Sequence, residues 1–333
     1  MKRRDFIKLS AGLGAAGLAT GLTSPAMAQT KSVFKASDVQ PPGYPTVAAT
    51  ESLGKKLEAA TNGRLSVRMY PSMQLGGEKE TIEQTQIGAV QLLRVSAGTL
   101  GPIVDEINVV NMPFLFKSTA HAEKMMDGPL GQELLDKITA NANAGLVGLC
   151  WMNSGARSLY NTKRPIKSIE DIKGLKFRVI GNPIFIDMMN ALGGNGVAMG
   201  YDQVFSALQT GVIDGAENNP PSYVFSNHYT AAKYLSLTEH LIIPEALVFS
   251  KKTWASLSGD DQGLIRKFAR ESQMEERDLW NKYEKDAMDK AQAAGCQIVE
   301  IADKKPFQDA VKPVWDKYGP KYQDMINRIQ AIA

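Results

Sequence analysis

Two arginines and a polar turn are the residues of this chain best suited to bind an anion. Arg178 lies in GLKFRVI (174–180), where apolar residues alternate with Lys176, Arg178 and Ile180, which predicts a half-buried strand. Arg157 lies upstream in the Gly-flanked stretch NSGARSLYN, and the polar turn GAENNPPS follows downstream. A planar guanidinium can grip a carboxylate through two parallel hydrogen bonds. Alternation alone leaves Arg178 either a solvated surface cation or half of an anion clamp.

The titratable residues form no catalytic motif. The three histidines are not paired at metal-binding spacing, and the chain has neither a G-x-S-x-G turn nor a phosphate-binding loop. Glu239 and His240 are neighbours and could form an acid–base pair, but a structural histidine is the interpretation we favour. We expect no enzyme, no metal site and no cofactor, although a pair of catalytic carboxylates would leave no sequence pattern.

The two cysteines, Cys150 and Cys296, lie in apolar, strand-like runs. We expect two buried free thiols. A disulfide is the alternative, because it is chemically permitted outside the cytoplasm. No Cys-x-x-Cys or Cys/His cluster indicates zinc.

The first 28 residues, MKRRDFIKLSAGLGAAGLATGLTSPAMA, have the pattern of an export signal. Twin arginines precede a Gly/Ala-rich apolar stretch that is too short for a membrane span, and the small-residue site predicts cleavage after Ala28. The G-x-G-x-x-G match GLGAAG falls inside this segment and is discarded as a nucleotide motif. Removing the segment's four basic residues and one acidic residue leaves 34 of each, so we expect an exported protein whose mature chain is formally neutral and has no nucleic-acid surface.

Strand-like and helix-like segments alternate along the rest of the chain. The expected strands are 31–38, 64–71, 91–97, 106–114, 145–152, 175–180, the end of the 201–219 segment, and PEALVFSKKTW from 244. The expected helices are 44–63, 76–90, about 118–127, 128–143, the short IEDIKG stretch, 182–194, the start of the 201–219 segment up to Gly211, 259–295 and about 303–331.

This alternation predicts an α/β fold with mixed sheets covered by helices. About 305 residues suffice for two lobes, and ligands of open α/β sheets bind at the carboxyl ends of the strands. The helix over 259–295 would run roughly 50 Å, so we expect it to span both lobes. Further strand-like segments after residue 240 indicate that the chain crosses between the lobes more than once.

Four ordered stretches resemble the periplasmic solute-binding proteins of TRAP transporters, the DctP type. They are YPSMQLGGEKETIEQTQIGAVQL, NMPFLF, GARSLYNTKRPIKSIEDIKGLKFRV and SALQTGVIDGAENNPPSY. The resemblance covers essentially all of 31–333. It implies a two-lobe periplasmic binding protein fold with an inter-lobe cleft that closes on an organic acid. The expected lobes are 31–153 plus 244–283 and 154–243 plus 284–333.

The resemblance also implies the ligand contacts. It makes Arg178 the main carboxylate ligand and adds Arg157, Asn218 in the G-x-E-N turn, and Glu78 as an acceptor for sugar hydroxyls. Arg94, within QLLRVSA, either supplies another cation or pairs with Glu78. The loop after the first strand adds Asp38 or Gln40, and Tyr223 either stacks on a sugar or belongs to the core.

This residue set suits a polyhydroxylated monocarboxylate. Glu78 disfavours a second ligand carboxylate beside it, because like charges in a closed cleft repel. We therefore expect a hexuronate such as glucuronate or galacturonate, resembling the uronate-binding branch, for delivery to the large and small membrane subunits of a TRAP permease. The alternatives are an aldonate, a C4-dicarboxylate or a 2-oxo acid, or an exported enzyme or sensor acting on sugar acids.

Overall fold

The computed structural model describes residues 31–333 of the 333-residue chain. The predicted export signal and its cleavage site after Ala28 lie outside these described residues. Within residues 31–333, no helix is both long and apolar enough to cross a membrane.

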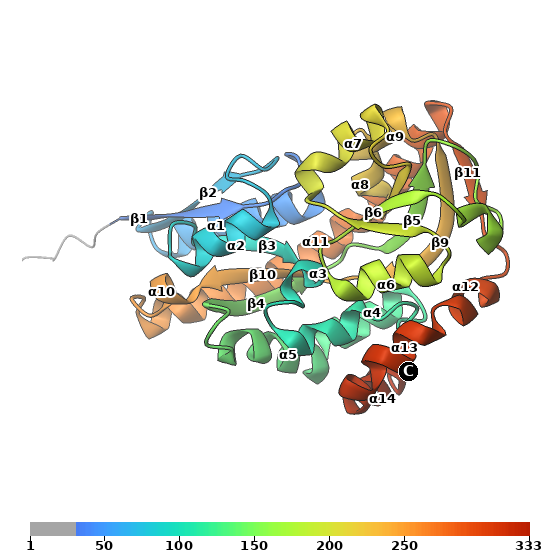
Figure 1. Ribbon diagram of the computed structural model, residues 1–333. Helices are drawn as coiled ribbons and strands as arrows, with labels where there is room; N and C mark the ends of the chain where they lie inside the picture. Colours follow the sequence, from blue (N-terminus) through green and yellow to red (C-terminus); the bar gives the residue numbers. More distant parts are fainter. Residues whose placement is uncertain (1–30) are drawn as a thin grey trace, which may run out of the picture. The chain divides into compact units, whose positions relative to one another are not determined.

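Five strands form the first sheet, sheet A, in the order β2-β1-β3-β10-β4 (Figure 1). Its first strand pairs in parallel with β2 and β3, whereas β10 runs antiparallel to β3 and β4. The strands are β1 (Ser32–Ser37), β2 (Leu65–Tyr70), β3 (Leu92–Ser96), β4 (Leu146–Met152) and β10 (Glu245–Ser250). The helices between them are α1 (Pro45–Ala60), α2 (Glu78–Gln86), α3 (Ala97–Leu100), α4 (Thr119–Asp127) and α5 (Pro129–Ala140).

Six strands form the second sheet, sheet B, in the order β11-β9-β5-β8-β6-β7. The strands are β5 (Ala156–Asn161), β6 (Lys176–Val179), β7 (Asn195–Ala198), β8 (Gly215–Asn218), β9 (Tyr234–Ile242) and β11 (Gln297–Glu300). The helices of this part are η2 (Ile169–Ile172), α6 (Pro183–Ala191), η3 (Tyr201–Gln203), α7 (Val204–Thr210), α8 (Pro220–Phe225) and α9 (His228–Ala231).

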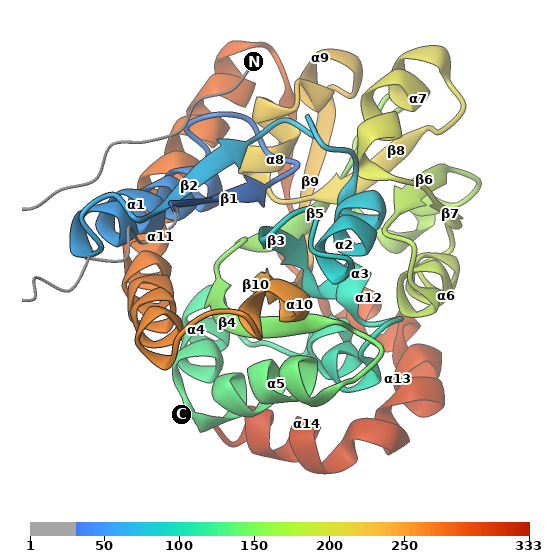
Figure 2. The ribbon, with the colours of Figure 1, turned by 90° about the vertical axis from the view of Figure 1, so that its left-hand side faces the viewer.

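Three connections join the two sheets. The chain passes from β4 to β5 through 153–155 and returns from β9 to β10 through 243–244, and the Ser154 hydroxyl donates to the carbonyl of Ile243 between these crossings. After β10, the short α10 (Lys251–Trp254) leads into the 35-residue α11 (Gly259–Ala293). This helix packs on α1 and β4 at one end and on α8 at the other, as Figures 1 and 2 show.

The predicted lobe boundaries remain a prediction. The strands of sheet A and of sheet B lie on the sides of 153/154, 243/244 and 283/284 that this prediction assigns to them. The C-terminal helices contact both parts: Arg328 pairs with Glu133 of α5, and Lys317 pairs with Asp187 of α6.

Three predicted elements differ in the structure. The strand predicted for PEALVFSKKTW ends at Ser250, because 251–254 form α10. Residues 106–114 are not a strand, because 105–111 form the 3₁₀ helix η1 (Asp105–Asn111). The side chains of Asn108 and Asn111 donate to the carbonyls of Gly101 and Ala97, and these tertiary bonds hold the segment against the α3 region instead of in a strand ladder.

The final predicted helix is broken into four pieces. Prolines at the starts of the second and third pieces interrupt helical hydrogen bonding, whereas the fourth follows the third directly as a change from 3₁₀ to α geometry. The four pieces are α12 (Lys305–Ala310), α13 (Lys312–Tyr318), η4 (Gly319–Tyr322) and α14 (Gln323–Gln330).

The strands β5, β7 and β9 were not expected from the sequence.

Cys150 and Cys296 are buried free thiols in separate hydrophobic clusters, which confirms the prediction of two buried free thiols.

Candidate functional site

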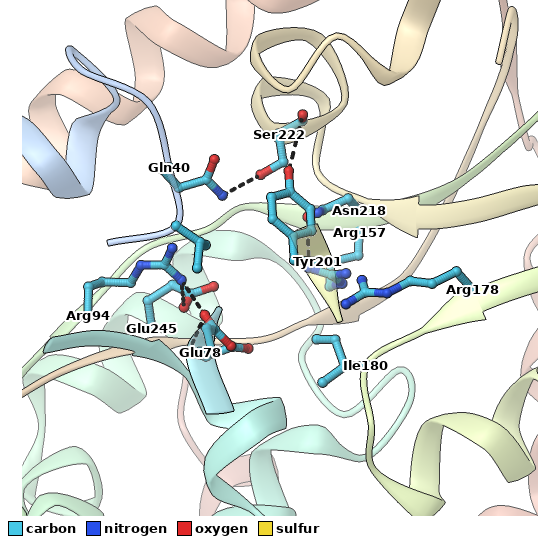
Figure 3. Close-up of a pocket in the computed structure, with 12 residues that line it drawn as sticks. Gln40, Glu78, Arg94, Arg157, Arg178, Ile180, Tyr201, Asn218, Ser222 and Glu245 are labelled. Carbon is cyan, nitrogen blue, oxygen red and sulfur yellow. Dashed lines mark hydrogen bonds and ion pairs between the residues drawn. The ribbon is translucent and has the colours of Figure 1, made fainter. Parts of the chain in front are cut away.

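A polar pocket lies where loops and strand ends of sheet A meet those of sheet B (Figure 3). The empty space between its walls is about 350 Å³ when the open solvent at its mouth is included. The lining residues are Val39, Gln40, Glu78, Arg94, Ser96, Arg157, Arg178, Ile180, Tyr201, Asn218, Ser222 and Glu245.

Strand β6 gives Arg178 a rigid support. Its neighbours Phe177 and Val179 are fully buried, and the strand pairs with β8 on one side and β7 on the other. Lys176, two residues earlier, is exposed to solvent, whereas Arg178 is only 4% exposed and its guanidinium reaches into the pocket. Lys176 and Arg178 lie on the same face of the strand, and only Arg178 is at the pocket.

Arg178 has no neutralising partner in the part of the chain that the structure describes. Its Nε donates to the carbonyl of Met199 at 2.8 Å, and its guanidinium carbon lies 5.7 Å from the ring centre of Tyr201. No carboxylate of residues 31–333 forms an ion pair with it, and its two terminal nitrogens have no hydrogen-bond partner there. Burial lowers the pKa of Arg178; the charge of Glu217 opposes this effect and Arg157 adds to it.

Arg157, in contrast, is fully engaged. Its Nε and Nη2 donate to the two carboxylate oxygens of Glu217 at 2.5 and 2.7 Å, and its Nη1 donates to Asn218 Oδ1 at 2.8 Å. Burial alone would raise the pKa of Glu217, but Arg157 and His240 hold it at about 2. This ion pair lies on the adjacent strands β5 and β8 and positions Asn218 at the pocket wall.

Glu239 and His240 do not face each other. Glu239 is exposed and forms an ion pair with Lys304, whereas His240 is buried and its Nε2 lies 3.7 Å from Glu217 Oε2. Adjacent strand residues point to opposite faces, so the sequence neighbours act separately. His240 is structural in this arrangement.

At the sheet A end of the pocket, Arg94 is surrounded by three carboxylates. Its Nη1 donates at 2.8 Å to both Glu78 Oε1 and Glu245 Oε2, and its Nε donates to Asp38 Oδ1 at 2.9 Å. Arg94 therefore pairs with Glu78, one of the two predicted alternatives, while also lining the pocket. Burial raises the pKa of Glu245 to about 7, with Arg94 opposing the rise and Glu78 adding to it.

The loop after β1 contributes one of its two predicted residues to the lining. Gln40 lines the pocket, and its Nε2 donates to Ser222 Oγ at 3.1 Å on α8. Asp38 does not line the pocket. It is buried beneath Arg94 and accepts hydrogen bonds from Thr46 Oγ1 at 2.6 Å and the Gln40 amide at 2.9 Å.

Sequence reasoning missed the polar lining residues Ser96, Tyr201, Ser222 and Glu245. The sequence could have indicated Glu245, because a carboxylate inside the apolar run PEALVF is expected to be buried and to need a partner. Tyr223, the predicted stacking candidate, is fully buried and donates to the carbonyl of Ala232, outside the lining.

Comparisons with known proteins converge on one family. The model of the DctP family, described as bacterial extracellular solute-binding protein, family 7, matches residues 36–321. A solute-binding protein of Chromohalobacter salexigens is 38% identical over 333 residues, covering 99% of this chain and 97% of that protein.

Two solved structures are similar in both sequence and fold. A TRAP periplasmic solute binding protein from Pseudomonas putida F1 with bound D-glucuronate is 53% identical, with a TM-score of 0.88, covering 90% of this chain and 97% of that one. A TRAP periplasmic solute binding protein from Bradyrhizobium sp. BTAi1, in complex with α/β-D-galacturonate, is 44% identical, with a TM-score of 0.87, covering 90% and 99%.

Proposed function

Because the chain belongs to the DctP family of TRAP-transporter solute-binding proteins, we propose that it captures a hexuronate, D-glucuronate or D-galacturonate. The predicted α/β binding-protein fold is that of these relatives. The proposed ligand is the one that two of them hold in their structures.

The observation that carries the proposal is the unpaired guanidinium of Arg178. A buried charge without a partner is costly, and the penalty amounts to several kcal/mol per ion. Arg157, Arg94 and Glu217 all have their counter-ions within the protein, whereas Arg178 projects into the pocket without one among residues 31–333. A ligand carboxylate would supply the missing anion.

Asn218 is suited to assist at the same end. Its Oδ1 accepts from Arg157 Nη1 at 2.8 Å and from the Asn219 amide at 2.9 Å. Its Nδ2 then remains to donate to a ligand oxygen, beside the two terminal nitrogens of Arg178. In this proposal Arg157 orients Asn218 and adds positive potential, and Glu78 and Gln40 meet the sugar hydroxyls.

The cellular role follows from the family. We propose that the protein is exported, that its signal is cleaved after Ala28, and that the loaded form delivers the uronate to the large and small membrane subunits of a TRAP permease. The support is the export-signal pattern of the first 28 residues and the extracellular class of the family.

A thermal-shift screen tests this function. Ligands that bind only the folded protein stabilise it by RT ln(1 + L/Kd), where L is the free ligand concentration, and so raise its melting temperature. We expect D-glucuronate or D-galacturonate to give the largest shift among uronates, aldonates, C4-dicarboxylates and 2-oxo acids. Absence of any shift with these acids would refute the proposal, and conversion of the ligand during long incubation would indicate an enzyme instead.

A further inference from the structure

The end of the pocket opposite Arg178 is unusually rich in carboxylates. Figure 3 shows Glu78 and Glu245 around Arg94, well separated from the guanidinium of Arg178. Both of these carboxylates line the pocket, and Asp38 pairs with the same guanidinium from below.

The charges at this end do not balance. Arg94 carries one positive charge, and its three nitrogens are all occupied: Nε and Nη2 by Asp38, and Nη1 by Glu78 and Glu245. The single negative charge of Asp38 is enough to balance the positive charge of Arg94. Glu78 also accepts from the Ser96 amide at 3.2 Å and from Thr99 Oγ1 at 2.5 Å, which hold its carboxylate facing the ligand space.

Glu245 is the least compensated of the three. It is 7% exposed, and the only side chain among the described residues that hydrogen-bonds it is the already neutralised Arg94. Its pKa of about 7, raised chiefly by burial, agrees with this geometry.

We propose that Glu245, acting with Glu78, rejects a second ligand carboxylate, so that the protein selects sugar monoacids and excludes the corresponding diacids. This inference rests on the proposed function and adds Glu245 as a specificity-determining residue. A hydroxyl at this end can donate a hydrogen bond to either carboxylate. A carboxylate there has no proton to donate and is repelled by negative groups within a few ångströms in a water-poor site.

A matched pair of ligands isolates this effect. L-Gulonate and D-glucarate share the open chain, the stereochemistry and the first carboxylate, and they differ only in having CH₂OH or COO⁻ at the other end. We expect calorimetric titration at pH 8.5 to give a dissociation constant for D-glucarate at least a hundredfold above that for L-gulonate. D-Glucuronate, whose corresponding carbon is a hemiacetal, serves as the positive control.

The variant Glu245→Gln removes the proposed repulsion while keeping the side-chain shape. We expect the ratio of the two dissociation constants to fall by tenfold or more. Glu133→Gln removes one carboxylate from the surface pair with Arg328, far from the pocket lining, and is expected to keep the wild-type ratio.

A pH comparison tests the same proposal without a variant. At pH 5.5 the Glu245 carboxyl is largely protonated, while both carboxylates of D-glucarate stay ionised. The wild-type ratio should therefore be smaller at pH 5.5 than at pH 8.5, and the ratio for Glu245→Gln should change less. This double comparison also corrects for the other charged or titratable groups around Glu245, which are Arg94 of β3, Glu78 of α2, Asp38 after β1, Tyr44 before α1, Arg157 of β5 and Glu276 of α11.

Each outcome separates this inference from the proposed function. Tight binding of D-glucuronate together with equal affinity for L-gulonate and D-glucarate overturns the inference alone. An unchanged ratio in Glu245→Gln, or a wild-type ratio that is the same at both pH values, also overturns it. If none of the three acids binds, the proposed uronate function itself fails.

Discussion

Arg157 and Arg178 are both buried arginines of sheet B, but they differ in what neutralises them. Arg157 donates twice to Glu217, whereas Arg178 donates only to the carbonyl of Met199 among the described residues. The first arginine holds β5 and β8 together at the pocket wall, and the second presents an uncompensated charge to the pocket. This difference was not predictable from the sequence, because both arginines occur in similar short stretches and Glu217, the partner of Arg157 alone, is remote from it in the chain.

Replacing Arg178 should stabilise the protein when no ligand is present. Arg178→Met removes an uncompensated buried charge, so we expect the free energy of unfolding to rise by about 1–3 kcal/mol. Lys176→Met, which removes an exposed cation from the same strand, should change it by no more than about 0.5 kcal/mol. Urea denaturation of the ligand-free proteins measures both values, and a less stable Arg178→Met protein would contradict the interpretation.

Breaking the Arg157–Glu217 pair should lower the free energy of unfolding, in contrast to the replacement of Arg178. Glu217→Gln leaves Arg157 buried without its counter-ion, which we expect to cost about 3–5 kcal/mol at pH 7. The folded-state pKa of Glu217, about 2, lies below its ordinary 4.5, so its contribution is present above 4.5 and lost as pH falls toward 2.

Denaturation at pH 7 and pH 3 checks this expectation, because the difference between wild type and Glu217→Gln should shrink at pH 3. Glu133→Gln, which breaks an exposed pair with Arg328, is the control and should cost less than about 1 kcal/mol. A Glu217→Gln protein as stable as wild type at pH 7 would rule out a structural role for the pair.

Most predicted site residues were found through the resemblance to TRAP solute-binding proteins, whereas residue type and local pattern alone singled out Arg178, Arg157 and the polar turn GAENNPPS. The structure brings Arg178, Arg157, Asn218, Glu78, Arg94 and Gln40 together in one pocket, although their roles as ligand contacts remain predictions. Asp38 is the exception, since the chain turns at 38–40 and directs Asp38 under Arg94 while Gln40 reaches the pocket. Which residue of a loop lines a pocket depends on tertiary contacts, and the alternation of apolar and polar residues does not predict these contacts.

Among the elements, α11 carries a buried carboxyl at the crossing between the sheets. Glu276 is fully buried; its Oε2 accepts from the Asn153 amide at 2.8 Å, and its Oε1 has no partner among the described residues. Burial raises the pKa of Glu276 to about 8, with the Asn153 hydrogen bond opposing the rise. The carboxyl is therefore neutral in the folded protein at neutral pH.

This carboxyl should make stability fall as pH rises. Because its folded-state pKa of about 8 exceeds its ordinary 4.5, its contribution is complete below 4.5 and is lost as pH rises through about 8. The slope from one group is at most about 1.4 kcal/mol per pH unit. We expect Glu276→Gln to show a flatter profile between pH 5 and pH 8 in urea denaturation, and parallel profiles for the two proteins would contradict this.

The elements also show where local patterns suffice. The alternation of GLKFRVI predicted β6 and its buried face, and the helical spacing over 259–295 predicted α11 almost to the residue. The failures occurred where tertiary bonds or prolines overrode periodicity, as in η1 and in the broken C-terminal helix. Strand β5 was missed because its ARSLYN sequence has no sustained alternation.

At the scale of the molecule, polar contacts cross the pocket between elements of the two sheets. Gln40 and Tyr44, which follow β1, both hydrogen-bond Ser222 of α8, at 3.1 and 3.0 Å. The covalent links are the short crossings at 153–155 and 243–244, together with α11. We infer that these three links form a hinge and that the contacts around Ser222 belong to a closed state.

Solution X-ray scattering tests hinge closure. Saturating D-glucuronate should lower the radius of gyration of the wild-type protein, because the ligand stabilises the closed state over the open one. The variant Ser222→Ala, which removes the hydroxyl shared by Gln40 and Tyr44, should shift the ligand-free protein toward the open value. Superimposable curves with and without bound ligand would argue against closure.

Calorimetric titration of D-glucuronate into the wild-type protein and into Arg178→Lys tests whether the guanidinium of Arg178 binds the ligand carboxylate. Lysine keeps the positive charge but not the fork of donors, and hydrogen bonds to a charged group contribute about 1.5–3 kcal/mol. We predict measurable binding to wild type and about 10- to 150-fold weaker binding to Arg178→Lys. Equal dissociation constants for the two proteins would contradict this prediction.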